Sequence, residues 1–248
     1  MTRLTDQEFW ERRWRARPDA GWGEEVHPWT MPFHPILQRV LPRGGSFVEV
    51  GCAPGRNMVY FSRYFRYQVA GIDFVAEEFT RRTLEANHVE DYELYRMDFL
   101  EELPPRKFDV VASFGFVEHF TRLAEVIARH VALVNPGGHV VIGAPNLLGA
   151  QRLIRLVLDR AALRRHNPEA MKCPVLRGIL TDLGAREIVY CGHYRTFKLW
   201  LGPEGVSPAL VRAAALFDAC FQRLARLLRV DNIPNRFFSP YVLVIAKF

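Results

Sequence analysis

The sequence predicts an α/β fold built on a mostly parallel sheet with helices on both faces. From residue 46 onward, short apolar runs rich in β-branched residues alternate with longer segments of helical periodicity. This alternation is typical of a parallel sheet that is covered by helices. The chain has 248 residues without an internal repeat, and we expect it to form a single domain.

The alternation assigns each element in turn. A capping box at Thr5 to Glu8 opens a helix in which Trp10 and Trp14 lie one turn apart. Pro18 is expected to end this helix. Strands are predicted over residues 46–50, 68–72, 92–95, 108–113, 139–143, 186–191 and 241–246, and helices over residues 57–65, 76–86, 117–133, 147–165, 169–183 and 208–229.

Three parts are predicted within the domain. Residues 1–44 hold four of the five tryptophans and form an N-terminal aromatic cap. Residues 45–146 form the cofactor-binding core, and residues 147–248 supply the substrate-side helices and the last strand. The stretch 193–240 is too long for a simple connection and is interpreted as a helical insertion that forms a lid.

Composition excludes several classes of protein. Lysine and arginine total 33 against 27 acidic residues, so the net charge of +6 permits an anionic partner without requiring one. Four scattered cysteines form neither a C-x-x-C pair nor a metal-binding cluster, which predicts no disulfide framework and no zinc site. They are Cys52, Cys173, Cys191 and Cys220.

The sequence also predicts where in the cell the protein is found. The first ten residues are polar and no apolar run is long enough to cross a membrane, so a cytoplasmic protein is expected. The helices at 147–165 and 208–229 are basic and amphipathic. They are either surface helices packed on the core or a peripheral contact with an anionic lipid surface or a phosphate-bearing acceptor.

A loop of small residues follows the first predicted strand. It runs from Glu49 through Gly51, Cys52, Ala53 and Gly55 to Asn57, where a helix begins. Such a turn lets backbone N–H groups and a helix N-terminus approach a ligand. A dinucleotide fingerprint needs a small residue where this chain has Arg56, which argues against a nicotinamide cofactor.

Acidic residues end the next two strands. Asp73 closes the second strand, where a carboxylate can bind both hydroxyls of a ribose. Asp98 follows the third strand, where it could accept from an adenine amine while Phe99 packs on the ring. The ends of parallel strands converge on one crevice, and these residues together predict a nucleotide-type site there.

Residues 45–146 resemble the class I S-adenosylmethionine-dependent methyltransferases. The E-x-G-x-x-x-G loop, the two acids, the segment 108–119 with its terminal Glu-His, and the turn Asn-Pro-Gly-Gly at 135–138 carry the resemblance. It implies a Rossmann-like seven-stranded sheet with the last strand antiparallel, and S-adenosylmethionine as cofactor with S-adenosylhomocysteine as product. The implied cofactor-binding residues are Glu49, Gly51, Cys52, Ala53, Gly55, Asn57, Asp73, Phe74, Asp98, Phe99 and Phe114.

Histidines are the candidate catalytic residues. His119 follows the fourth strand beside the expected methyl group and is the first candidate for a general base. His166 and His193 are further candidates, each with a capping or surface role as the alternative. No metal is expected, because Gly115 replaces the first acid of the E-x-x-E-H element that holds magnesium in some RNA methyltransferases of similar sequence.

The function predicted is O-methylation of a small or medium acceptor, namely a hydroxyl of a secondary metabolite, a glycan or a lipid-linked intermediate. Nucleic acid is not the expected substrate, because the segment after the fourth strand lacks the D/N-P-P-Y/F element of nucleobase methyltransferases. An RNA or protein methyltransferase, or a non-catalytic cofactor-binding module, are the alternatives. The acceptor and the oligomeric state do not follow from the sequence.

Overall fold

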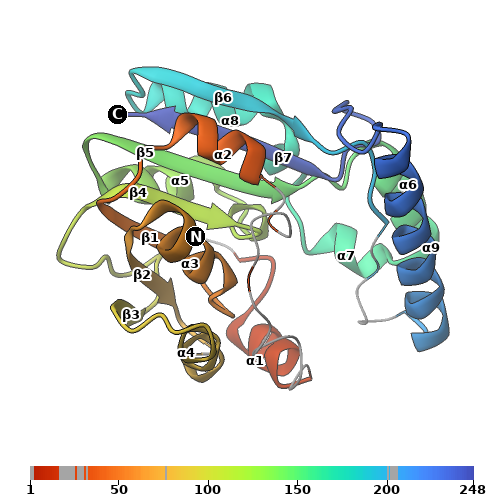
Figure 1. The fold of residues 1–248 in the computed structure, drawn as a ribbon, viewed down its shortest axis with the longest axis horizontal. Coiled ribbons are helices and arrows are strands. Elements are labelled where there is room, and N and C mark those ends of the chain that lie inside the picture. Colours follow the sequence, from red (N-terminus) through yellow and green to blue (C-terminus); the bar gives the residue numbers. More distant parts are fainter. Residues whose placement is uncertain are drawn as a thin grey trace.

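Seven strands form one sheet in the order β3-β2-β1-β4-β5-β7-β6 (Figure 1). All neighbouring pairs are parallel except those of β7, which runs antiparallel to β5 and β6. This confirms the predicted sheet and its antiparallel last strand. The strands are β1 (Ser46–Val50), β2 (Gln68–Asp73), β3 (Tyr92–Arg96), β4 (Phe108–Phe114), β5 (Val134–Pro145), β6 (Glu187–Tyr194) and β7 (Tyr241–Lys247).

Helices cover both faces of this sheet and gather at one end of it. In Figure 1, α2 and α3 lie on the near face, α5 and α8 on the far face, and α1, α6, α7 and α9 beyond the carboxyl ends of the parallel strands. The α-helices are α1 (Gln7–Arg15), α2 (His34–Val40), α3 (Arg56–Tyr60), α4 (Glu77–Ala86), α5 (Leu123–Ala132), α6 (Gly149–Leu158), α7 (Arg160–Arg164), α8 (Cys173–Asp182) and α9 (Pro208–Leu227).

The computed structural model describes most of the chain. Trp22, Trp29 and Pro18 of the predicted aromatic cap lie outside the described residues. Among those described, no helix is both long enough and apolar enough to cross a membrane. The described residues are 3–16, 26, 31, 33–75, 77–199, 201 and 206–248.

Two apolar clusters pack on opposite faces of the sheet. Phe47 and Phe61 belong to the cluster beneath α2 and α3, and their rings stack with centroids 4.0 Å apart. Val48, the next residue of β1, belongs to the cluster beneath α5 and α8. Successive strand residues point to opposite faces, so β1 is buried on both sides and holds the loop that follows it in place.

Several predicted helices are interrupted. The segment predicted over 117–133 begins as a 3-10 turn, η3 (Val117–His119), is interrupted where Phe120 becomes extended and pairs with Arg3, and continues as α5 from Leu123. The segment over 147–165 breaks at Asp159, whose side chain accepts from Ala162 N and so begins α7. The segment over 169–183 splits into a 3-10 turn, η4 (Pro168–Met171), and α8, which has a proline in its first turn.

Smaller differences concern helix ends. Asp6, rather than Thr5, is the N-cap of α1, because its carboxylate accepts from Phe9 N at 2.7 Å. Helix α2 was not predicted at all, since its apolar residues sit within an irregular aromatic stretch. The helix predicted over 57–65 begins as α3 and finishes as one π-helical turn, η2 (Phe61–Phe65).

Candidate functional site

The loop after β1 turns sharply at two glycines. Gly51 and Gly55 have φ angles of 73° and 91°, a region that side chains disfavour. A Cβ atom on Gly51 would lie 2.6 Å from the Phe116 ring. The loop therefore needs glycine at position 51 both for its conformation and for space.

Asp73 lies at the end of β2 against this loop. Its Oδ2 accepts from Ala53 N at 3.1 Å and its Oδ1 accepts from Val75 N at 3.0 Å. Burial raises the pKa of Asp73 to about 6, although the backbone N–H donors act in the opposite direction. Its carboxylate is fixed in orientation at the place where the sequence predicts the ribose.

Asp98 lies at the end of β3 and binds a partner that the sequence analysis did not predict. The Arg3 guanidinium forms an ion pair with Asp98 and lies over the Phe74 ring, 5.3 Å from its centroid. Leu100 N also donates to Asp98, at 2.9 Å. No local motif marks Arg3, because the contact spans 95 residues of chain.

A cavity of about 200 Å³ lies between the β1 loop and helix α1. A smaller hollow of about 20 Å³ continues it toward Asp98 and Phe99. Of the predicted cofactor residues, seven line one or both of these spaces. They are Gly51, Ala53, Asp73, Phe74, Asp98, Phe99 and Phe114.

Glu49, Cys52 and Gly55 support the loop from behind, whereas Asn57 lines a larger cavity. Glu49 is buried, its Oε1 accepts from Asn57 Nδ2 at 2.5 Å, and its Oε2 lacks a hydrogen-bond partner among the described residues. Burial raises the pKa of Glu49 well above its usual value. The Cys52 side chain packs on Gly71 of β2, and Gly55 is the N-cap of α3.

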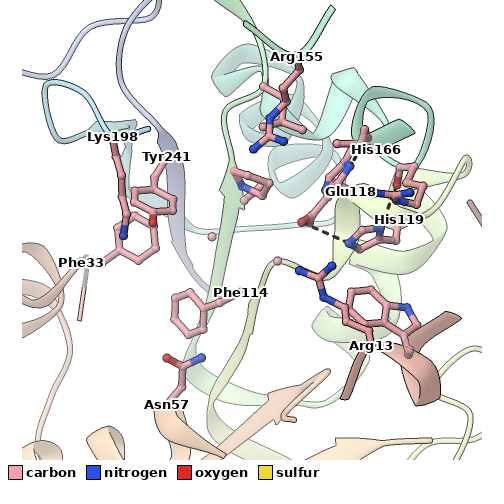
Figure 2. A pocket seen from close by; sticks show the side chains of 18 of the residues that line it. Arg13, Phe33, Asn57, Phe114, Glu118, His119, Arg155, His166, Lys198 and Tyr241 are labelled. Atoms are coloured by element: carbon pink, nitrogen blue, oxygen red, sulfur yellow. Dashed lines mark hydrogen bonds and ion pairs between the residues drawn. The ribbon is translucent and has the colours of Figure 1, made fainter. Parts of the chain in front are cut away.

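A second cavity, of about 520 Å³, adjoins the first. Phe114 and Gly115 line both, together with His119 and helix α1 residues Trp10 and Arg13. Aromatic side chains form one wall, with Phe33 stacked on Phe114 at a centroid distance of 5.9 Å. Figure 2 shows Phe33 and Tyr241 on one side of this space and Glu118, His119 and Arg13 on the other.

Three titratable side chains lie close together on the wall of the larger cavity opposite the aromatic side chains. Glu118 and His119 come from η3, and His166 follows α7. One ligand-type atom of each lies within 4.8 Å of the others. His119 Nε2 is 3.8 Å from Glu118 Oε1, and the two imidazole centroids are 4.7 Å apart.

Burial determines the protonation of this cluster. It raises the pKa of Glu118 to about 8 and lowers the pKa of His119 to about 3. The pKa of His166 falls to about 4, again mainly through burial. At neutral pH both imidazoles are therefore uncharged.

Cationic residues that the sequence analysis did not single out as site residues also line the large cavity. Arg155 is buried and pairs with Asp159 at 2.8 Å. The Arg165 guanidinium lies 5.0 Å from the centroid of the Phe9 ring. Arg13 and Lys198 complete the set. The basic character of residues 147–165 was the only sequence signal for this feature, and it did not indicate which arginines face inward.

The structure separates the three predicted catalytic histidines. His119 and His166 lie side by side in the large cavity. His193 lies on β6, paired in register with Val242, and does not line either large cavity. Glu118 stands beside the two cavity histidines, and the sequence analysis quoted it as part of the Glu-His motif without assigning it a role.

The fold and the two adjoining cavities define a class of enzyme, the Rossmann-like S-adenosylmethionine-dependent methyltransferases. The sequence profile of the family described as "Methyltransferase domain" matches residues 26–174, and the chain belongs to this family. Its cofactor is S-adenosylmethionine, as the sequence predicted.

The chain is also similar to individual proteins of known sequence or structure. The chain is 31% identical over 104 residues to a "Ubiquinone biosynthesis O-methyltransferase" of Rhodopseudomonas palustris, spanning 42% of this chain and 41% of that relative. A SAM-dependent methyltransferase structure from Thermotoga maritima superposes with a TM-score of 0.58 at 12% identity, covering 96% of this chain and 97% of the other. One from Mesorhizobium loti gives 0.57 at 18% identity, covering 90% and 100%. These structural likenesses support the fold, including its antiparallel last strand.

Proposed function

We propose that the protein transfers a methyl group from S-adenosylmethionine to a hydroxyl of a small aromatic or partly apolar acceptor. The observation that carries this proposal is the junction of the two cavities. Phe114, Gly115 and His119 line both, so a donor in one space and an acceptor in the other would meet there. Holding two reactants in line is the main contribution that such an enzyme makes to the rate.

The residues of the smaller cavity fit the cofactor. Asp73 offers oriented carboxylate oxygens for a ribose, and Gly51 leaves room for close approach of the backbone. Phe74 and Phe99 supply apolar surface at the end where an adenine would lie. The bound cofactor supplies a methyl group activated by a sulfonium.

The larger cavity suits an acceptor with an aromatic body and a hydroxyl. Phe33, Phe114 and Tyr241 offer ring surfaces. His119 donates its Nδ1 proton to the Arg165 carbonyl at 2.9 Å, so Nε2 carries a lone pair that faces the cavity. A hydroxyl can donate to that atom, which orients its oxygen toward the junction.

The arginines favour an acceptor with acidic character. Arg13, Arg155 and Arg165 line the cavity with Lys198, against the carboxylate of Asp159 and a Glu118 that burial keeps largely protonated. A phenol or a carboxylate-bearing ring fits the positive electrostatic potential of this cavity better than an amine does. The curated relatives named as O-methyltransferases support the same choice, although the R. palustris protein is matched over less than half of its length.

An acceptor screen tests this proposal. The full chain is incubated with S-adenosylmethionine and matched sets of catechols, hydroxybenzoates and aromatic amines, and S-adenosylhomocysteine is quantified. We expect product with phenolic acceptors and none with the amines. Product only with RNA or protein substrates, or cofactor binding without turnover in every set, would refute the proposal and favour the alternative functions.

We also propose that helices α6 and α9 contact an anionic lipid surface, from which a lipid-linked acceptor could enter the site. Both helices pack on one small apolar cluster, to which α6 contributes Ile154 and Leu158 and α9 contributes Leu210, Val211 and Ala214. Their outer sides remain apolar, with Val157 81% exposed and Leu227 79% exposed. All large exposed apolar side chains of the described chain lie between residues 153 and 238.

The net charge around helices α6 and α9 favours an anionic lipid surface. Residues 149–165 and 206–238 hold ten arginines and three aspartates, a net charge of +7, while the rest of the chain carries −1. Exposed arginines beside exposed apolar groups are typical of a helix that lies on an anionic bilayer. A neutral protein partner would not require this concentration of charge.

Vesicle sedimentation tests the contact. The protein should sediment with vesicles of phosphatidylglycerol and phosphatidylcholine and much less with phosphatidylcholine alone. The double variant Val157→Ser with Leu227→Ser, both at exposed positions, should lose most of the binding while keeping cofactor affinity. Equal sedimentation of the variant, or none of the wild type with anionic vesicles, would contradict the contact.

A further inference from the structure

The cluster of Glu118, His119 and His166 has a hydrogen-bond arrangement that the O-methylation proposal does not by itself explain. His119 Nδ1 bonds to Arg165 O at 2.9 Å, and His166 Nδ1 bonds to Ala162 O at 2.6 Å. A carbonyl oxygen only accepts, so both Nδ1 atoms carry the ring proton. The two Nε2 atoms are consequently lone-pair acceptors, and His119 Nε2 lies 3.8 Å from Glu118 Oε1.

Glu118 adds a further acceptor at the same point. Its side chain is 1% exposed and its Oε2 has no hydrogen-bond partner in the described part of the chain. Oε1 lies 3.8 Å from His119 Nε2, which is too long for a hydrogen bond between them. The two imidazole lone pairs and the Glu118 carboxyl group thus face one another in a buried place, where either the proton that burial keeps on Glu118 or a bound cation can lie between them.

We propose that Glu118, His119 and His166 bind one divalent transition-metal cation, such as Zn²⁺ or Mn²⁺, through the glutamate carboxylate and the two Nε2 atoms, with open positions facing the acceptor cavity. Two imidazoles and a carboxylate suit such ions. Ligands about 2.1 Å from one ion lie roughly 3 to 3.5 Å apart. The present separations, all within 4.8 Å, reach that range by side-chain rotations of about an ångström.

The hydrogen bonds that hold both imidazoles are compatible with a metal site. Histidine ligands commonly donate the other ring N–H to a carbonyl, which fixes the tautomer and aims the ring. The guanidiniums of Arg13, Arg155 and Arg165 act on the same cluster and Asp159 pairs with one of them. The net positive charge of these four side chains repels a cation, which predicts that the cluster binds its metal ion less tightly than a structural zinc site does.

The expectation of no metal depended on Gly115 in place of an acid. His166 supplies a different third donor from 47 residues beyond His119, and no spacing rule connects it to the Glu-His motif. Helix α7 and its C-terminal turn bring it there.

The catalytic role of this cation rests on the proposed O-methylation, whereas the binding of the cation does not. An acceptor hydroxyl oxygen at an open position loses its proton to water more readily beside a dication. The resulting oxyanion then forms the new C–O bond while the C–S bond breaks, and the electron pair of that bond remains on sulfur. The acceptor oxygen would then be held at the junction of the cavities by the cation, and His119 Nε2 would act as a ligand of the cation in place of accepting from the hydroxyl.

Calorimetry on the tag-free full chain tests the site without any acceptor. After treatment with EDTA and desalting, the protein is titrated with ZnCl₂, MnCl₂ and MgCl₂. We expect one equivalent of zinc or manganese to bind, and Glu118→Gln and His166→Gln to weaken this at least tenfold. His193→Ala is the matched control and should bind as the wild type, since His193 lies outside the cavity.

Binding of S-adenosylmethionine by each variant shows that the variant is folded. Absence of stoichiometric metal binding by the wild type, or wild-type binding by both cluster variants, would overturn the site. Methyl transfer that persists fully in EDTA, with zinc binding otherwise as expected, would overturn the catalytic role alone. Metal binding as expected without transfer to any hydroxyl acceptor would instead refute the proposed function.

Discussion

The proposed cofactor end and the proposed acceptor end of the site are built in different ways. The cofactor end is formed by short contiguous segments, each directly after a strand, as with Gly51 after β1 and Asp73 at the end of β2. The acceptor end is assembled from η3, α1 and the segment around His166, which are far apart in the sequence. A local motif therefore specifies the first end, while tertiary packing specifies the second.

Replacing His119 is the strongest way to test this division. We expect His119→Ala to lower turnover by about a hundredfold or more, the range for loss of a group that handles a proton. Cofactor affinity should remain nearly unchanged, because Asp73 and the β1 loop supply the polar groups proposed to bind the cofactor. Steady-state kinetics and calorimetry with S-adenosylmethionine measure the two effects, with His193→Ala as control; full activity of His119→Ala would remove it from the chemistry.

Replacing Asp73 gives the complementary effect at the cofactor end. Asp73→Ala should weaken binding of S-adenosylmethionine by about tenfold or more, because the variant loses the charged acceptor for ribose hydroxyls. The Ala53 N–H loses its partner at the same time. Calorimetry gives the affinity directly, and an unchanged value would mean that the ribose lies elsewhere.

The two ends of the site also differ in how well the sequence predicts them. Gly51, Ala53, Asp73 and Phe74 were predicted and line the cofactor cavity, because strand ends converge in any parallel sheet. Sequence patterns did not predict Arg3 against Asp98. That pairing depends on how the N-terminal segment crosses Phe120, which only the folded chain determines.

The acceptor end was predicted less well for a physical reason. The helix expected over 147–165 has the right apolar periodicity, but the Asp159 side chain caps a new helix and pairs with Arg155. That break starts α7, after which His166 stands beside His119. A single hydrogen-bonding side chain thus changes the site, and hydrophobic periodicity carries no information about it.

The pH dependence of cofactor binding sharpens the assignment of Asp73. Burial raises the pKa of Asp73 to about 6, so its carboxylate gains a proton as the pH falls through 6 and loses its ability to accept from two hydroxyls. Affinity should fall below pH 6, approaching about tenfold per pH unit. Asp73→Asn should bind weakly with a flat profile over the same range, measured by calorimetry; a wild-type profile that stays flat from pH 7 to 5 would contradict the assignment.

The smallest effect is expected at Arg3, which lines the proposed cofactor end of the site just before helix α1. Its ion pair with Asp98 is partly exposed, with the side chains 29% and 31% accessible, and such pairs contribute at most about 1 kcal/mol. If Asp98 accepts from the adenine amine, Arg3 competes for the same oxygens. Arg3→Ala should then tighten cofactor binding by up to about fivefold, whereas the matched exposed change Arg12→Ala on α1 should leave it unchanged. Weaker binding by Arg3→Ala would assign Arg3 to the cofactor itself, stacked with Phe74, and would make the N-terminal segment a part of the cofactor site.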